Sequence, residues 1–174
     1  IVGRPNVGKS TLFNRIVGER VAIIERTKGV TRDRVYRDAE WDGVPFKVVD
    51  TGGIVTSLTD MDRLYREVRE QSLKAIEESD VVIFLTDVKE GLHPLDEEIA
   101  ELLRKSKKNV VLAVNKVDNE KLKQDIGEFE KLGIKDLIPI SALHGQGVDI
   151  LLDKVVSWLK VQEVARKGGE EDYI

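Results

Sequence analysis

Two uninterrupted apolar runs limit the folds open to this chain more than any other feature of its sequence. Val81–Asp87 and Asn109–Asn115 are rich in β-branched residues and lack the polar alternation of a strand with one wet face. Such runs are typical of parallel strands that are buried on both faces. Asp136–Ser141 is a shorter run of the same kind. Because parallel strands need crossover connections, we predict an α/β protein with helices on both faces of its sheet.

Amphipathic patterns between these runs predict the helices. Apolar residues recur at helical spacing in four segments. These residues are Leu64, Val68, Ala75 and Ile76; Ile99, Leu102 and Leu103; Ile126, Phe129 and Leu132; and Val148, Leu151, Leu152, Val155, Val156 and Leu159. One segment differs, because residues 35–50 hold two extended runs around Asp42 and Gly43, a strong β-hairpin signal. We therefore predict a mostly parallel, six-stranded sheet with one antiparallel strand.

The composition excludes several classes of protein. A length of 174 residues is enough for one domain with a real core. A net charge of −4 gives no general preference for nucleic acid or for anionic membranes. The chain has no cysteine, which excludes disulfides and thiolate metal sites, and no apolar run long enough to span a bilayer. We expect a soluble, cytoplasmic protein without a membrane partner.

Both ends suggest that the chain is a piece of a longer protein. It begins without methionine, and residues 163–174 carry Gly168 and Gly169 followed by acidic residues. Such a composition is typical of a linker. We expect a globular domain over residues 1–162 and an acidic linker over residues 163–174, leading to a further domain.

The stretch GRPNVGKS matches the phosphate-binding pattern G-x-x-x-x-G-K-[ST] between a predicted strand and a predicted helix. Its glycines let the backbone wrap around a phosphate, and the amides point inward at the positive end of the helix. Lys9 is expected to reach the β- and γ-phosphates, and the Ser10 hydroxyl to bind Mg²⁺. The residues expected to line this loop are Gly3, Arg4, Pro5, Asn6, Val7, Gly8, Lys9, Ser10 and Thr11.

A second motif, DTGG, follows the hairpin. Asp50 ends the second extended run, where its carboxylate is expected to hold Mg²⁺ through a water. The Gly53 amide is expected to bind the γ-phosphate and, without a side chain, to move when that phosphate leaves. Ile54 can neither accept a proton nor orient a water molecule. The expected nucleotide contacts here are Asp50, Thr51, Gly52, Gly53 and Ile54.

The stretch NKVD, which follows the Asn109–Asn115 run, indicates the base. The Asp118 carboxylate matches the adjacent N1–H and N2–H₂ donors of guanine, whereas adenine offers no such pair. We expect Asn115 to tie this loop to the phosphate loop, the Lys116 stem to cover the base, and the Ala142 amide to meet guanine O6. The expected base contacts are Asn115, Lys116, Val117, Asp118, Ser141, Ala142 and Leu143. The four motifs, in order and at strand ends, predict binding of GTP and GDP.

Two further features lie outside the motifs, a polar segment and a pair of histidines. The polar segment Glu25–Arg34 is predicted to be a mobile loop from which Thr31 reaches Mg²⁺. Thr27 is the competing candidate, because distance from Ser10 does not separate the two threonines. The two histidines, His93 and His144, have no carboxylate or second histidine at ligand spacing. We expect both to be solvated surface residues.

GRPNVGKSTLFN, GVTRDR, DTGGI, NKVD and SAL together resemble the first G domain of the Der (EngA) family of bacterial GTPases. This family belongs to the class that contains Era and TrmE. The resemblance implies the Ras-like G domain of the P-loop NTPases, GTP hydrolysis with Mg²⁺, and a monomer. It also implies a second G domain and a KH-like domain in cis. The implied role is late assembly of the large (50S) ribosomal subunit, in contact with its RNA.

The resemblance also offers an explanation for Ile54, which stands where a water-activating side chain would be expected. Members of this class have a hydrophobic residue where Ras-like proteins have a catalytic glutamine, and Ile54 falls at that position. Asn6 matches the asparagine that holds potassium in related enzymes, with carbonyls of the Glu25–Thr31 loop completing the ion's shell. The implied catalytic residues are Lys9, Asn6, Thr31 and Gly53.

Three alternatives stay open at this stage. The first is a GTP- and GDP-sensing module with negligible hydrolysis, and the second is the G domain of a TrmE-like tRNA-modification GTPase. The third alternative is a different P-loop enzyme such as a small-molecule kinase, against which Asp118 argues. Potassium-dependent turnover would exclude the sensing module, and a lack of ATP binding would exclude the kinase. A TrmE-like G domain would be embedded in a helical domain, whereas the acidic linker predicted here leads to a second G domain.

Overall fold

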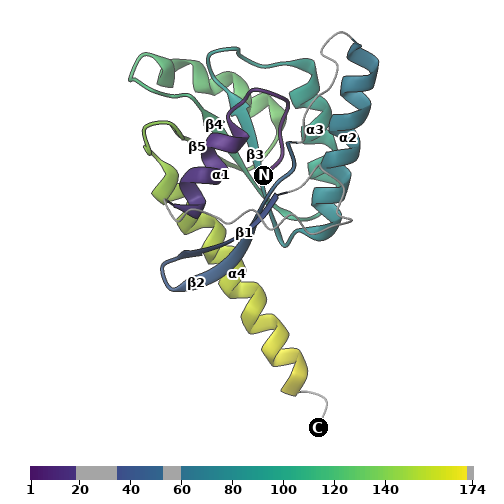
Figure 1. Cartoon of the computed structure of the whole chain (residues 1–174), viewed down its shortest axis with the longest axis vertical. Coiled ribbons are helices and arrows are strands. Elements are labelled where there is room, and N and C mark those ends of the chain that lie inside the picture. Colours follow the sequence, from purple (N-terminus) through teal and green to yellow (C-terminus); the bar gives the residue numbers. More distant parts are fainter. Residues whose placement is uncertain (19–34, 53–59, 172–174) are drawn as a thin grey trace.

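The computed structural model describes residues 1–18, 35–52 and 60–171 (Figure 1). The elements are α1 (Lys9–Val17), β1 (Val35–Trp41), β2 (Val44–Asp50), α2 (Met61–Glu78), β3 (Val81–Asp87), α3 (Pro94–Lys105), β4 (Asn109–Asn115), the 3₁₀ helix η1 (Leu122–Leu132), β5 (Asp136–Pro139) and α4 (Val148–Glu171). Strands and helices alternate from β2 onward, which confirms the predicted α/β class. None of the described helices is long and apolar enough to cross a membrane.

The three apolar runs form a parallel sheet in the order β3-β4-β5. Asp87 at the end of β3 is in register with Asn115 at the end of β4. The carboxyl ends of the strands therefore meet at one edge, where ligands bind in sheets of this kind. The sequence-based prediction of buried parallel strands is confirmed, because Val82–Asp87 and Val111–Asn115 are buried.

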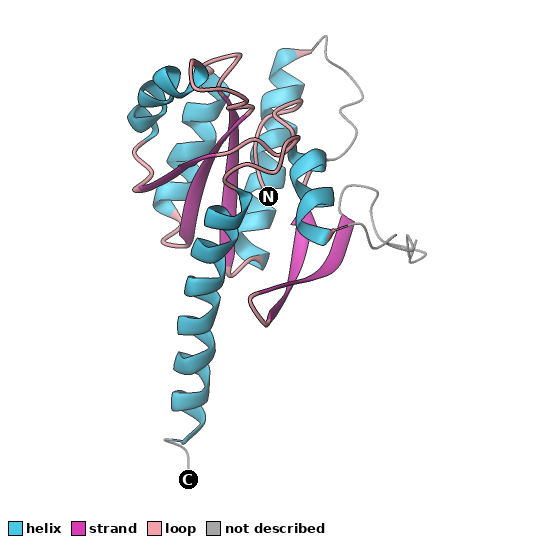
Figure 2. Cartoon of the chain, turned by 90° about the vertical axis from the view of Figure 1, so that its left-hand side faces the viewer, coloured by secondary structure: helices cyan, strands magenta, loops and turns pink. Residues whose placement is uncertain are grey.

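The predicted hairpin is also present. β1 and β2 pair antiparallel from Val35 opposite Asp50 to Trp41 opposite Val44. Asp42 and Gly43 between them have φ of 51° and 75°, the conformation that a two-residue hairpin turn requires. Figure 2 shows the hairpin as a group of strands separate from the parallel sheet. The Trp41 indole donates a hydrogen bond of 2.8 Å to Asp153 and so attaches the hairpin to α4.

The first two residues join the hairpin to the parallel sheet. The Val2 amide donates to Ile83 O at 2.9 Å, and the Leu85 amide donates to Val2 O at 2.8 Å. On the other side, the main-chain nitrogen of Ile1 donates to Val49 O at 2.8 Å. Val2 contributes a single bridge because the chain turns away at Gly3. The described residues thus form five strands and two isolated bridges, one of them made by Val2, so they show fewer than the six strands predicted.

Helices cover both faces of the parallel sheet, as predicted. α2, α3 and η1 pack on one face around Phe84 and Leu112. α1 and α4 pack on the other face around Leu85 and Val111 (Figure 1). The segment with Phe129 and Leu132 is a 3₁₀ helix, although its buried residues are those of the predicted stripe. α4 continues to Glu171, so the predicted domain boundary at residue 162 falls inside a helix.

Candidate functional site

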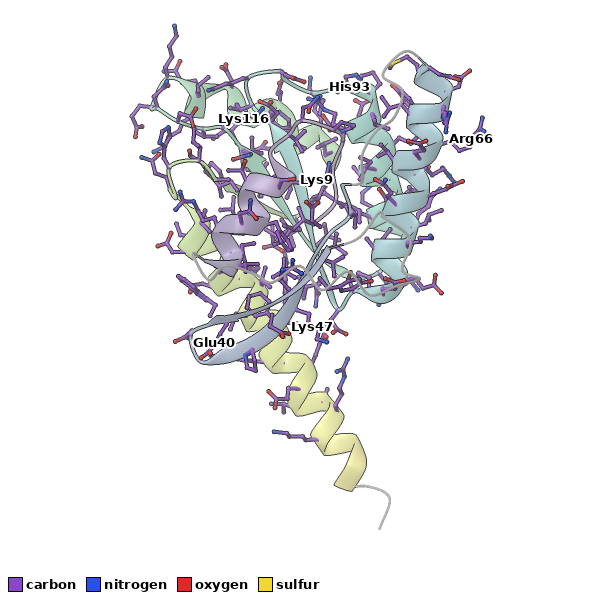
Figure 3. All side chains as sticks on the ribbon, in the orientation of Figure 1. Lys9, Glu40, Lys47, Arg66, His93 and Lys116 are labelled. Atoms are coloured by element: carbon purple, nitrogen blue, oxygen red, sulfur yellow. The ribbon has the colours of Figure 1, made fainter. Side chains whose placement is uncertain are left out.

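The phosphate loop begins where Val2 leaves the sheet and ends where α1 starts. A Cβ at Gly3 would lie 2.5 Å from the main-chain oxygen of Leu85, so only glycine fits against β3 here. Gly8 has a φ of 102°, and a Cβ there would collide with the Asn115 amide group. The two glycines are therefore required because neighbouring strands approach the loop closely. In Figure 3, Lys9 and Lys116 lie at the same end of the molecule, opposite Glu40 and Lys47 on the hairpin.

Lys9 folds back over its own loop. Its ammonium donates to Gly3 O and to Arg4 O, each at 2.8 Å. Burial lowers the pKa of Lys9 to about 8, while Asp50 acts in the opposite direction. The ammonium thus sits at the start of the phosphate loop, bound to carbonyls that it can exchange for phosphate oxygens.

The two predicted Mg²⁺ ligands in the described residues lie side by side. Ser10 Oγ donates to Asp50 Oδ2 at 3.2 Å, and Asp50 Oδ1 accepts from the Gly52 amide at 2.9 Å. Mg²⁺ in nucleotide sites takes one or two protein oxygens beside phosphates and waters. A hydroxyl and a carboxylate in contact at the mouth of the phosphate loop fit that requirement. Thr31, Thr27, Gly53 and Ile54 lie outside the described residues.

Asn115 connects the three loops of the site. Its Nδ2 donates to Val7 O at 2.9 Å, and its Oδ1 accepts from the Ala142 amide at 3.0 Å. The expected tie between the base loop and the phosphate loop is therefore present. The Ala142 N–H donates to Asn115 here, and its expected contact with guanine O6 stays a prediction. Leu143, the next residue, is exposed, and its carbonyl accepts from Arg15 at 2.8 Å.

The Asp118 carboxylate is held on both oxygens. Oδ1 accepts from Ser141 Oγ at 2.8 Å, and Oδ2 accepts from Lys89 Nζ at 2.6 Å. The hydrogen bond from Lys89, followed by that from Ser141, lowers the pKa of Asp118. The group is therefore an ionised acceptor, as recognition of two adjacent donors requires. Val117, between Lys116 and Asp118, is buried and packs in the core instead of facing the pocket.

The structure adds residues that sequence reasoning missed. Asp87 at the end of β3 is buried and lies 2.7 Å from Lys116 Nζ, which also donates to Asn6 O at 2.9 Å. Asp87 ends an apolar run as Asp50 does, a signal that was visible in the sequence. Lys89 gave no such signal, since its partner is 29 positions away.

His93 is not the purely solvated residue that we expected. Its Nδ1 accepts from the Leu95 amide at 3.0 Å, and its own amide donates to Asp96 Oδ2 at 3.0 Å. These reciprocal bonds form a capping box at the N-terminus of α3. The imidazole Nδ1 of His93 supplies an acceptor at a position where serine or aspartate is usual.

A cavity of about 520 Å³ lies at the phosphate loop. Its lining includes Gly3, Pro5, Asn6, Gly8, Lys9, Ser10, Thr11, Gly52 and Lys116. A second cavity of about 600 Å³ lies between the hairpin, α2 and α4 and is lined by none of the predicted catalytic or metal-binding residues. The chemistry therefore belongs to the first cavity, where cationic side chains, a helix N-terminus and the Ser10–Asp50 pair converge.

The lowered pKa of Lys9 predicts proton uptake when a nucleotide binds. Near pH 8 about half of the free protein has a neutral Lys9, and nearby phosphate oxygens raise its pKa because they favour the ammonium. The bound state then holds more protons, so affinity for GDP falls as pH rises above about 8. Titration calorimetry at pH 8 in buffers of different ionisation enthalpy should show uptake of about half a proton. Lys9→Arg, which stays charged, should take up none; equal uptake in both proteins would contradict the assignment.

Comparisons with known proteins agree with this geometry. A family model described as 50S ribosome-binding GTPase matches residues 1–116. GTPase Der of Caldicellulosiruptor saccharolyticus is 52% identical over 174 residues, which cover 100% of this chain and 39% of that protein. GTPase Der of Aquifex aeolicus is 51% identical over 164 residues, covering 94% and 37%. The chain thus spans less than two fifths of the length of these relatives.

Solved structures give the same fold. A variant of Era from Aquifex aeolicus bound to GDP.AlF4⁻ has a TM-score of 0.69 and 33% identity, covering 90% of this chain and 55% of that one. Era in complex with MgGDPNP and part of 16S ribosomal RNA has a TM-score of 0.70 and 32% identity, covering 90% and 54%. The fold is that of the P-loop GTPases, and the predicted resemblance to Der is confirmed. On its fold, its four motifs and the match over residues 1–116, the chain belongs to the 50S ribosome-binding GTPase family.

Proposed function

We propose that this chain is a GTP-binding and GTP-hydrolysing switch that depends on Mg²⁺ and is stimulated by potassium. The observation that carries the proposal is the double contact of Asn115, which ties the base loop to the phosphate loop at Val7 and to the Ser141–Leu143 loop at Ala142. The ionised Asp118 carboxylate would then bind guanine, while Lys9 and the amides of α1 would bind the phosphates. A site built in this way favours guanine over adenine, which argues against a kinase that uses ATP.

The chain's own residues supply most of the proposed mechanism. Lys9 leaves the carbonyls of Gly3 and Arg4 and binds phosphate oxygens, where the site pre-arranges positive charge for the transition state. Mg²⁺ held by Ser10 and Asp50 would neutralise phosphate charge. Because no proton acceptor stands at position 54, the chain positions and stabilises the reacting groups, and a water attacks without a side-chain base.

Potassium is the proposed substitute for the missing side chain. Asn6 is exposed, has a φ of 67°, and its side chain makes no hydrogen bond within the described part of the chain. Its amide oxygen is therefore available to a cation at the edge of the phosphate loop. Sodium is smaller and fits a shell of carbonyl and amide oxygens less well.

Phosphate release from GTP with excess Mg²⁺, in potassium and then in sodium at equal ionic strength, tests this proposal. We expect at least a tenfold faster rate in potassium, because one preorganised charge-stabilising contact contributes about 100- to 1,000-fold. Asn6→Ala should abolish the difference between the ions. Asn14→Ala, an exposed asparagine on α1, should keep it. A potassium response that survives Asn6→Ala would refute the cation site.

Two alternatives are outcomes of the same measurement. Equal, near-zero rates with tight GDP binding would favour a nucleotide-sensing module, or a GTPase completed by other parts of a longer protein.

The similarity to Der favours assembly of the large ribosomal subunit over a TrmE-like role in tRNA modification. We propose that role in the cytoplasm for a longer protein, in which residues 1–162 are a monomeric G domain joined to further domains.

A further inference from the structure

Arg4 lies in the phosphate loop, but its side chain points out of the nucleotide cavity. The guanidinium is buried, and its Nε lies 3.2 and 3.3 Å from the two carboxylate oxygens of Asp96. One terminal nitrogen donates to Glu90 at 2.6 Å. The Arg4 carbonyl, on the opposite side of the same residue, is one of the two acceptors of Lys9.

Asp96 is itself fixed by the start of α3. It has no exposed surface, and its Oδ2 also accepts from the His93 amide in the capping box. Glu90 belongs to the connection between β3 and α3, where its amide donates to Asp87 Oδ1 at 3.3 Å. Arg4 therefore attaches the first turn of the phosphate loop to a segment more than 80 residues away.

Packing alone would not require charged side chains at this contact. A buried ion pair is seldom more stabilising than an apolar side chain of similar volume, because both charges lose their water. What two charged partners do provide is a defined orientation, since a guanidinium binds carboxylates through a rigid fork of donors. The orientation fixed here is that of the loop's first turn and of the carbonyl that holds Lys9.

We propose that Arg4 is a positioning residue, which through Asp96 and Glu90 presets the phosphate loop for the β-phosphate of a guanine nucleotide. The role rests on the proposed function. Without the contact of Arg4 with Asp96 and Glu90, the phosphate loop has to become ordered when the diphosphate binds. Loss of this contact should therefore weaken binding of the β-phosphate and leave recognition of the base unchanged.

The ratio of the dissociation constants for GMP and GDP measures this effect. Asp96→Asn keeps the shape but loses the charge, and Arg4→Lys keeps the charge but loses the fork. We expect each to lower GDP affinity about tenfold and GMP affinity less than about twofold. Glu90→Gln, at the exposed end of the contact, should give a smaller change of the same sign. Because Glu90 is exposed, this variant should fold even if the other two do not. Glu101→Gln, which removes an exposed ion pair on α3, is the control and should change neither.

Amide hydrogen exchange of the ligand-free protein gives an independent test. In Asp96→Asn, amides of the phosphate loop should exchange at least about tenfold faster, with α4 unchanged. A wild-type ratio of GMP to GDP affinity, with both nucleotides weakened equally, would show a merely structural role and overturn the proposal. Unchanged exchange in the loop would also overturn it. If the chain bound no GDP at all, the proposed function would be wrong. The exchange experiment would still show whether the contact of Arg4 with Asp96 orders the phosphate loop.

Discussion

Asp118→Asn is expected to lower the affinity for GDP about 100-fold and to make the diphosphate of xanthosine the preferred ligand. The carboxylate offers two acceptor oxygens, held by Ser141 and Lys89. A carboxamide replaces one of these acceptors with an NH₂ donor. This donor cannot bind the amine of guanine, but it can bind the carbonyl that xanthine has at the same position. A hydrogen bond to a charged group contributes about 1.5–3 kcal/mol, and 1.4 kcal/mol is tenfold in affinity.

The measurement is a fluorescence titration with both diphosphates, repeated on the two proteins and a control. Asp125→Asn makes the same chemical change at an exposed position on η1 and should leave both affinities unchanged. Unaltered GDP binding in Asp118→Asn would mean that the base pocket has been placed wrongly. Weaker binding without a gain for xanthosine diphosphate would mean that the ion pair with Lys89 matters more than the contact with the base.

Asn115→Ala should be the most destabilising single change in the site. It leaves the Val7 carbonyl and the Ala142 amide buried without their partners. Each buried group left unpaired costs about 1–3 kcal/mol, so the free energy of unfolding should fall by about 2–6 kcal/mol. At about 2–4 °C per kcal/mol, the midpoint of thermal unfolding should drop by about 4–24 °C. GDP affinity should fall as well, because the phosphate and base loops lose their common anchor.

Circular dichroism melts and GDP titrations check this expectation. Asn109→Ala, at the other end of β4, provides the matched control. The Asn109 side chain makes no hydrogen bond within the described part of the chain, so its loss should cost under about 0.5 kcal/mol. Equal melting temperatures for the two variants would show that Asn115 does not hold the loops together.

Local patterns were sufficient to predict the sheet core and most of the site. The runs at Val81–Asp87 and Asn109–Asn115 predicted buried parallel strands, since such strands need apolar residues on both faces. The glycines at positions 3 and 8, Lys9 and Asp118 were predicted because close approach to a phosphate or a base permits few residue types. The 3₁₀ geometry of residues 122–132 escaped prediction, because a 3₁₀ helix and an α-helix show nearly the same apolar spacing over so few turns.

The sequence by itself determined the α/β class, the motifs and the chemistry of each motif, because all of these depend on residues within a few positions of one another. The tertiary structure alone decided which polar groups meet. It paired Arg4 with Asp96, Lys89 with Asp118, and Ala142 with Asn115. Contacts between residues 27 to 92 positions apart depend on how the strands order in the sheet and how the loops at their carboxyl ends converge. No local pattern records this, because side-chain pairing across a fold leaves no spacing signal in the chain.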